Sequence, residues 1–223
     1  MSTRILLVRH GATQLAAEDR FAGSSDIPLS DIGEMQATRL SARLAERPIN
    51  AFYASPMIRT MRTASIIAQP HNLPVQTVDA LREISHGHWE QMSRAEVEAR
   101  FPDEYRTWEQ DPFTFAPLEG ESGVSVLARA LPALRSIVAQ HEGQTVLIVS
   151  HKATIRLLLG SLLGFDLRGY RDRLDQSPCS LNVLDFKDTT RARLMLFNDV
   201  SHYDNHPQPT QAALSKWWDA CRT

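Results

Sequence analysis

The chain has 223 residues, of which 43% are hydrophobic, and this is enough apolar material to build the core of one α/β domain. The formal net charge of −2 provides no overall positive field, so we expect no nucleic-acid partner and only a local anion site. The N-terminus lacks the apolar stretch of a secretion signal, and the longest apolar-rich stretch, residues 155–165, is too short to span a membrane. The two cysteines, Cys179 and Cys221, suit a reducing compartment, so the sequence predicts a cytoplasmic protein with no membrane partner.

The first predicted element is a strand at residues 4–8, RILLV, and a second of the same kind lies at 145–149, TVLIV. Both are continuous and rich in branched aliphatic residues rather than alternating, which is typical of strands buried on both faces of a parallel sheet. Shorter strands are predicted at residues 51–54, 75–78, 181–186 and 193–197.

Helical patterns lie between these strands. Ser30 is expected to cap a helix whose core-facing residues are Ile32, Met35, Leu40 and Leu44. Ser55 and Pro56 form a cap and first-turn pair for a helix that runs to Ala68. Ser122 is expected to cap a third helix, and residues 153–164 form a fourth; the core side of the third carries Val126, Leu127, Leu131, Leu134 and Val138.

The alternation of strands and helices predicts an α/β fold, namely a single-domain three-layer sandwich with a mainly parallel sheet and helices on both faces. Residues 85–121 break the rhythm with a Pro- and aromatic-rich insertion that holds at most one or two short helices. Long loops in compact domains are usually functional, so we expect this insertion to cover the active site. The domain is predicted to span residues 1–203, and residues 204–223 to form a tail with a short helix at Trp217 and Trp218.

Polar side chains follow the predicted strands at the points where they end. Arg9 and His10 follow the first strand, His151 follows the strand at 145–149, and Arg59 lies on the first turns of the helix after residues 51–54. Open parallel sheets bind their ligands at the carboxyl ends of their strands, and a helix N-terminus beside arginines favours an anion. These strand ends are therefore predicted to converge on one positive pocket that suits a phosphate group.

Six motifs in this chain resemble those of the histidine phosphatases, the superfamily that includes the cofactor-dependent phosphoglycerate mutases. They follow the family's order over roughly the first 160 residues: LLVRHGAT, FAGSSDIPLSDIGEMQA, YASPMIRTMRTA, LREISHGHWE, GES and VSHKATIR. The resemblance implies a phosphoglycerate mutase-like fold and an active site that handles a phosphoryl group without a metal or other cofactor.

The resemblance also implies roles for individual residues. His10 would be the nucleophile and become phosphohistidine, while Glu83 would give a proton to the leaving oxygen. Three further side chains would bind the phosphoryl group, and three positions would contact the rest of the substrate. The first set is Arg9, Arg59 and His151, and the second is Thr13, Gly23 and Lys152.

Two positions depart from the family pattern. Ala16 stands where many members have asparagine, so one secondary polar contact near the phosphate is absent or is supplied by another residue. Lys152 replaces a glycine that commonly follows the second histidine, and it could add a charge for an anionic substrate. A nearby group of arginines, Arg168, Arg171 and Arg173, is more typical of a solvated charged face, and contact with the substrate is the alternative.

The leading hypothesis is a metal-independent phosphatase of the histidine acid phosphatase type that hydrolyses a small phosphorylated metabolite. A mutase is the first alternative, but the stretch after Glu83 does not resemble the long substrate loop of the mutases. A non-catalytic module that binds a phosphorylated ligand is the second. His86 and His88 lack a third ligand at suitable spacing, so no metal site is predicted. The tail at Trp217 would pack on its own body or on a second copy, which leaves a homodimer open.

Overall fold

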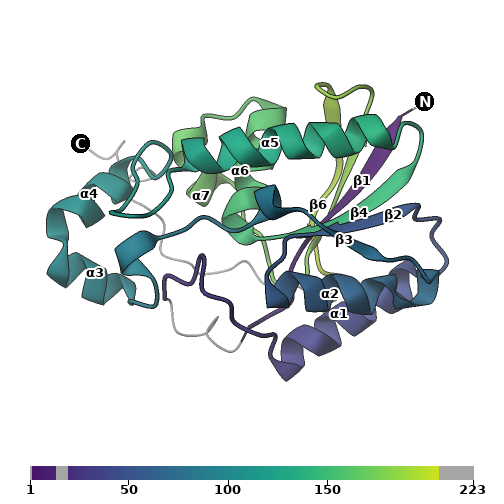
Figure 1. Cartoon of the computed structure of the whole chain (residues 1–223), viewed down its shortest axis with the longest axis horizontal. Helices are drawn as coiled ribbons and strands as arrows, with labels where there is room; N and C mark the ends of the chain where they lie inside the picture. The colour runs from purple at the N-terminus through teal and green to yellow at the C-terminus, as the bar shows by residue number, and fades with distance from the viewer. Residues whose placement is uncertain (1, 14–19, 206–223) are drawn as a thin grey trace.

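The computed structural model describes residues 2–13 and 20–205, and within them the strands form one six-stranded sheet in the order β3-β2-β4-β1-β5-β6 (Figure 1). Strands β3, β2, β4 and β1 run parallel, whereas β5 pairs antiparallel with both of its neighbours. This confirms the predicted mainly parallel sheet. The strands are β1 (Thr3–Arg9), β2 (Ala51–Ala54), β3 (Val75–Thr77), β4 (Thr145–Ser150), β5 (Leu181–Phe186) and β6 (Ala192–Asp199).

Helices cover both faces of this sheet, as predicted. Helices α1 (Asp31–Leu44) and α2 (Ile58–Ala68) pack on one face. Helices α5 (Gly123–Gln140) and α6 (Lys152–Leu163) pack on the other. Figure 1 shows the two pairs on opposite sides of the strands.

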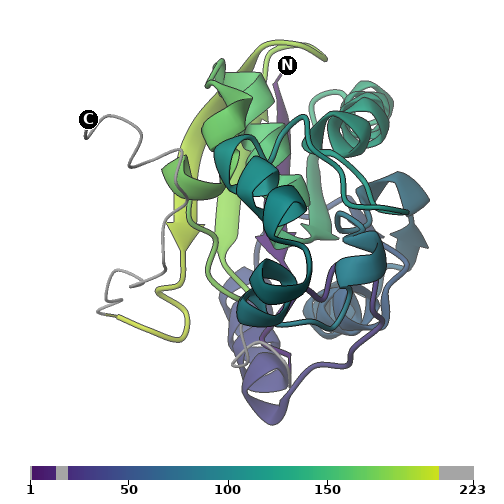
Figure 2. The same ribbon diagram turned by 90° about the vertical axis from the view of Figure 1, so that its left-hand side faces the viewer.

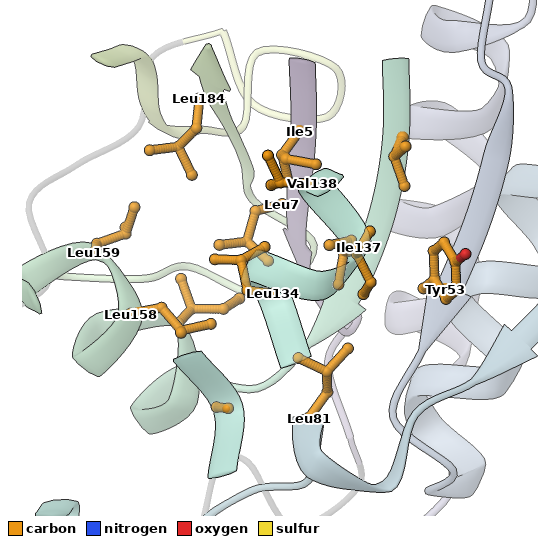
Figure 3. Packing of buried hydrophobic residues seen from close by; sticks show 14 of the residues in the cluster. Ile5, Leu7, Tyr53, Leu81, Leu134, Ile137, Val138, Leu158, Leu159 and Leu184 are labelled. Atoms are coloured by element: carbon orange, nitrogen blue, oxygen red, sulfur yellow. The ribbon is translucent and has the colours of Figure 1, made fainter. Parts of the chain in front are cut away.

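The central strands are buried on both faces because consecutive side chains of a strand point to opposite sides. In β1, Ile5 and Leu7 join the core under α5 and α6, whereas Leu6 and Val8 join the core above α1 and α2. Figure 3 shows Leu134 and other residues of the first core gathered beside Ile5 and Leu7. Continuous aliphatic strands thus hold the two helix layers together.

Two of the predicted caps are confirmed and one is wrong. The Ser30 hydroxyl accepts a hydrogen bond from the Gly33 backbone N–H, and Ser122 caps α5 in the same way. The prediction for Ser55 is wrong, because α2 begins at Ile58 with Met57 at its N-cap position and no side-chain cap.

The predicted core face of α1 is also partly wrong. Leu40 and Leu44 are buried, but Ile32 and Met35 are 61% and 39% exposed. Gly33 sets this rotation, because a Cβ there would lie 2.1 Å from the Ala12 carbonyl oxygen. The glycine lets α1 approach the chain after β1, and Ile32 is consequently turned toward solvent.

The insertion at residues 85–121 folds into α3 (Arg94–Arg100), α4 (Pro102–Gln110) and a single 3-10 turn, η3 (Gly87–Trp89). An aromatic cluster holds it together, with Trp89 fully buried and Trp108 and Phe21 packed beside it. Figure 1 shows α3 and α4 at one end of the molecule, and Figure 2 turns this end toward the viewer. The short helix α7 (Tyr170–Arg173) follows α6.

The remaining 3-10 turns are η1 (Gln69–His71), η2 (Asp79–Leu81) and η4 (Leu167–Gly169). Ala16 and the predicted tail helix at Trp217 and Trp218 lie outside the described residues. A helix of the length and apolar character required to cross a bilayer does not occur in residues 2–13 or 20–205.

Helix α5 offers a test of the core with an internal control. Leu134 is fully buried in α5, whereas Val124 in the same helix is 45% exposed. We expect Leu134→Ala to lower the free energy of unfolding by about 2 to 5 kcal/mol, because it removes buried methyl groups and leaves a cavity. Val124→Ala should change it by less than about 1 kcal/mol. Urea unfolding of both variants measures the difference, and equal losses would contradict this packing.

Candidate active site

A cavity of about 270 Å³ lies at the carboxyl end of β1. Among the predicted site residues, seven line it and one does not. His151 is fully buried behind the cavity wall, with its ring centroid 5.2 Å from that of His10. The seven that line the cavity are Arg9, His10, Thr13, Gly23, Arg59, Glu83 and Lys152.

The imidazole of His10 is held in one tautomer. Its Nδ1 lies 2.8 Å from the Gly11 carbonyl oxygen, and because a carbonyl only accepts, Nδ1 carries the proton. Nε2 therefore keeps its lone pair. Burial, followed by the charges of Arg9 and Arg59, lowers the pKa of His10 well below its usual value of 6.5. The ring is thus neutral at neutral pH and can act as a nucleophile.

The chain after His10 is fixed by two backbone contacts. The Gly11 N–H donates to Thr63 Oγ1 at 3.1 Å, and the Ala12 N–H donates to Gln36 Oε1 at 3.0 Å. A Cβ at Gly11 would lie 2.5 Å from the Gly33 carbonyl oxygen, so only glycine fits. The carbonyl that orients His10 is therefore anchored to α1 and α2.

Ser55 fixes the second histidine and is a site residue that the sequence reasoning missed. Arg59 Nε donates to His151 Nδ1 at 3.3 Å, so Nδ1 is the acceptor and the ring proton lies on Nε2. His151 Nε2 is 2.8 Å from the buried Ser55 hydroxyl, which accepts that proton. Burial and the neighbouring His10 lower the pKa of His151 well below its usual value. Ser55 was expected to cap a helix, and a serine before proline gave no sign of this contact.

Arg59 is aimed by backbone carbonyls. Its Nη1 donates to the Ser25 oxygen at 2.7 Å, and its Nη2 donates to the Gly23 oxygen at 2.8 Å. Glu90 holds this loop in turn, since its carboxylate accepts from the Ser24 N–H at 2.9 Å and the Ser25 hydroxyl at 2.8 Å. Each terminal guanidinium nitrogen keeps a second hydrogen, so Arg59 retains donors for an oxyanion.

Gly23 has a steric reason to be glycine. A Cβ there would lie 1.8 Å from the Ile84 carbonyl oxygen. The residue was predicted to contact the substrate. In the structure its backbone carbonyl oxygen accepts the hydrogen bond from Arg59 Nη2 that positions this arginine.

Arg9 enters the cavity from the end of β1. Its Nη1 donates to the Gln176 carbonyl oxygen, while its buried Nε has no hydrogen-bond partner among the described residues. Burial, with a smaller effect from Arg156, lowers the pKa of Arg9 to about 10. The guanidinium therefore keeps its charge at neutral pH, and an anion in the cavity would stabilise it.

Glu83 lines the cavity at the N-terminus of α6. Its carboxylate accepts hydrogen bonds from the Ala153 and Thr154 N–H groups, both at 3.1 Å. The Thr154 hydroxyl lies 3.2 Å from the same carboxylate and donates its shorter hydrogen bond to the Arg82 carbonyl oxygen, at 2.7 Å. These donors fix the carboxylate where it faces the same cavity as His10.

Lys152 and Thr13 line the cavity from distant parts of the sequence. Lys152 is the first residue of α6, and its Nζ lies 3.7 Å from Asp175 Oδ1. Burial, then repulsion from Arg156 and Arg9, lowers the pKa of Lys152 to about 8. Thr13 forms an isolated bridge with Leu29 at the cavity rim.

One expectation about the charged surface is wrong. Arg171 was expected on a solvated face, but it lines the cavity, with its Cζ 4.0 Å from the centre of the Trp108 ring. Trp108, which lies in the insertion at residues 85–121, also lines the cavity. His86 lies on the wall too, and the part of the chain that the structure describes holds no group of three residues able to bind a metal ion.

The site combines the neutral imidazoles of His10 and His151, the guanidinium groups of Arg9 and Arg59 and the carboxylate of Glu83, and this combination suits phosphoryl chemistry. Comparison with known proteins agrees with this class. The family model of the histidine phosphatase superfamily (branch 1) matches residues 5–200. The chain therefore belongs to this superfamily.

Individual relatives cover most of the chain. Phosphoserine phosphatase 1 of Hydrogenobacter thermophilus is 36% identical over 164 residues, which are 74% of this chain and 78% of that protein. A probable phosphoglycerate mutase GpmB of Escherichia fergusonii is 31% identical over 209 residues, or 90% of this chain and 95% of that protein. The structure of YhfR from Bacillus stearothermophilus has a TM-score of 0.85 and 33% identity, covering 91% of this chain and all of that one.

The lowered pKa values of His10 and His151 predict how stability depends on pH. Below pH 6.5 the unfolded chain binds protons that the two buried rings do not, so the free energy of unfolding falls as pH falls. His10→Gln and His151→Gln should each weaken this dependence. In each variant, the free energy of unfolding should fall by about 1 kcal/mol less between pH 7.5 and pH 5.5 than in the unaltered protein. Urea unfolding at the two pH values tests this. The same slope in both variants and the unaltered protein would contradict the neutral, buried state of these rings.

Proposed function

We propose that this protein is a phosphatase that transfers the phosphoryl group of a small phosphorylated metabolite to His10 and then to water, with no metal required. The orientation of His10 is the observation that carries the proposal, since Nδ1 is held by the Gly11 carbonyl and Nε2 is left as a nucleophile in a positive cavity. Membership of the superfamily and the similarity to a phosphatase support it.

In the first step, the Nε2 lone pair of His10 attacks phosphorus and the bond from phosphorus to the ester oxygen breaks. Arg9 and Arg59 hold the phosphoryl oxygens and offset the charge that spreads over them. Glu83, in its protonated form, gives its proton to the departing alkoxide. The products are an alcohol, a Glu83 carboxylate and phosphohistidine, whose remaining proton on Nδ1 stays bonded to the Gly11 carbonyl.

In the second step, water attacks the phosphohistidine from the side that the alcohol has left. Glu83 accepts a proton from this water, and the bond between phosphorus and Nε2 breaks. The lone pair returns to Nε2, inorganic phosphate departs and Glu83 is again protonated. His151 supports both steps as a positioning residue, because it ties Arg59 to Ser55 behind the reacting atoms.

A mutase is the second candidate, favoured by the similarity to the probable phosphoglycerate mutase. It would return the phosphoryl group to a hydroxyl of the substrate instead of water. Measuring released inorganic phosphate against isomerised ester separates the two activities.

His10 can be tested directly as the nucleophile. His10→Gln should lose turnover by at least about a thousandfold, since the covalent route is closed. Rapid quenching at alkaline pH during turnover of a ³²P-labelled ester should trap label on the unaltered protein and none on the variant. His141→Gln, at the opposite end of β1, is the control and should keep both. Substantial turnover by His10→Gln would refute the assignment.

Glu83 can be tested through the leaving group. An alkoxide needs a proton in the transition state and a nitrophenolate hardly does, so Glu83→Gln should slow hydrolysis of an alkyl phosphate by about a hundredfold or more. Hydrolysis of p-nitrophenyl phosphate should fall by less than about tenfold. The measurement is kcat for both esters. Equal losses would instead indicate that Glu83 positions α6 or binds substrate.

A further inference from the structure

Arg9 is held in the cavity by a single backbone carbonyl. Within residues 2–13 and 20–205, the one hydrogen bond that its guanidinium donates goes from Nη1 to the Gln176 carbonyl oxygen. Arg59, by contrast, donates to two backbone carbonyls and to His151. The direction of the Arg9 guanidinium therefore depends on the position of one peptide group, in the loop between α7 and β5.

The side chain of Gln176 fixes this peptide group. Gln176 is buried, and its amide pairs with the amide of Asn182, which is fully buried in β5. Gln176 Nε2 donates to Asn182 Oδ1 at 3.0 Å, and Asn182 Nδ2 donates to Gln176 Oε1 at 2.8 Å. The Ser180 hydroxyl also donates to Gln176 Oε1, at 3.2 Å. These hydrogen bonds hold the long side chain of Gln176 in one orientation.

Asn182 ties the pair of amides to the neighbouring strands. Its Nδ2 also donates to the Leu7 carbonyl oxygen of β1 at 3.1 Å, and its Oδ1 also accepts from the Asn198 N–H of β6 at 2.9 Å. These backbone partners define which end of the amide is the donor, and all four of its hydrogen-bonding positions are used. A buried amide is costly unless its hydrogen bonds are made, so rotation of either side chain is disfavoured.

The sheet does not need these amides in order to form. Strands β1 and β5 pair in continuous register along residues 3–8 of β1, and this pairing involves their backbones. What the amides add is the position of the loop at residues 176–180. The same loop contacts the end of β1, because the Arg9 N–H donates to the Ser180 carbonyl oxygen at 3.2 Å. The loop therefore holds both the backbone and the guanidinium of Arg9.

We infer that Gln176 and Asn182 are positioning residues for Arg9, because their paired amides hold the carbonyl oxygen that directs the Arg9 guanidinium. With Nη1 anchored, the guanidinium is in place before a phosphoryl group arrives. Binding then avoids the cost of ordering a long side chain. This inference rests on the proposed function, in which Arg9 holds the phosphoryl oxygens.

A double-mutant cycle on the affinity for inorganic phosphate, measured by calorimetric titration, tests this role. Gln176→Met keeps the length of the side chain and the backbone carbonyl but removes the amide. It should weaken phosphate binding by about tenfold, the loss expected for one charge-assisted hydrogen bond. In the Arg9→Met background the same change should alter the affinity by less than about twofold, because the residue through which Gln176 acts is gone. Thr3→Val removes a buried hydroxyl bond at the opposite end of β1 and is the matched control, which should keep the affinity.

The order of the two guanidinium groups gives a second readout, which a general loss of stability would not produce. ¹⁵N relaxation of the arginine Nε–H groups should show Arg9 ordered in the unaltered protein and mobile in Gln176→Met. Arg59 is held by other carbonyls and should stay ordered in both proteins. Urea unfolding establishes that each variant is folded. If Gln176→Met does not fold, Asn182→Thr, which keeps one hydroxyl, replaces it in both measurements with the same expected results.

The outcomes separate this inference from the proposed function. Additive losses of phosphate affinity, or an Arg9 Nε–H group as ordered in the variant as in the unaltered protein, would overturn the positioning role and leave the phosphatase proposal intact. A non-additive cycle in a protein that shows neither turnover nor phosphoenzyme would overturn the phosphatase proposal alone.

Discussion

Arg9 and Arg59 hold positive charges beside two buried imidazoles, and the rest of the site is arranged around this electrostatic constraint. Because both rings are buried and lie beside these charges, the histidines stay neutral rather than add to the charge. A neutral imidazole is a nucleophile, and two charged guanidinium groups are an attractive site for a phosphoryl group. The same constraint therefore supplies both the reactive group and the binding site.

Holding such groups together requires a rigid frame, and the frame begins in the core. The alternating side chains of β1 fix its end between two helix layers, and Arg9 and His10 emerge at that end. The Gly11 carbonyl, anchored through Thr63, then selects the tautomer of His10. Glu90 positions Arg59 indirectly, because it holds the loop whose backbone carbonyls accept hydrogen bonds from Arg59.

Much of this could be predicted from the sequence. A continuous aliphatic run in an α/β chain, such as residues 145–149, predicts a strand buried on both faces of the sheet. A reactive residue directly after such a run is therefore expected at the carboxyl end of the strand. The predictions that were wrong depended on contacts between residues far apart in the sequence. Ile32 is exposed because Gly33 contacts Ala12, and Ser55 binds a histidine nearly one hundred residues away. Periodicity and capping rules describe local structure and carry no information about such distant contacts.

The protonation of His10 in the ligand-free protein can be measured directly. Long-range ¹H–¹⁵N correlation spectra in phosphate-free buffer at pH 6 report the protonation of each ring nitrogen. The structure predicts that His10 is neutral at this pH, with its proton on Nδ1 and a lone pair on Nε2. An imidazolium, or a neutral ring with the proton on Nε2, would contradict the electrostatic origin of the nucleophile.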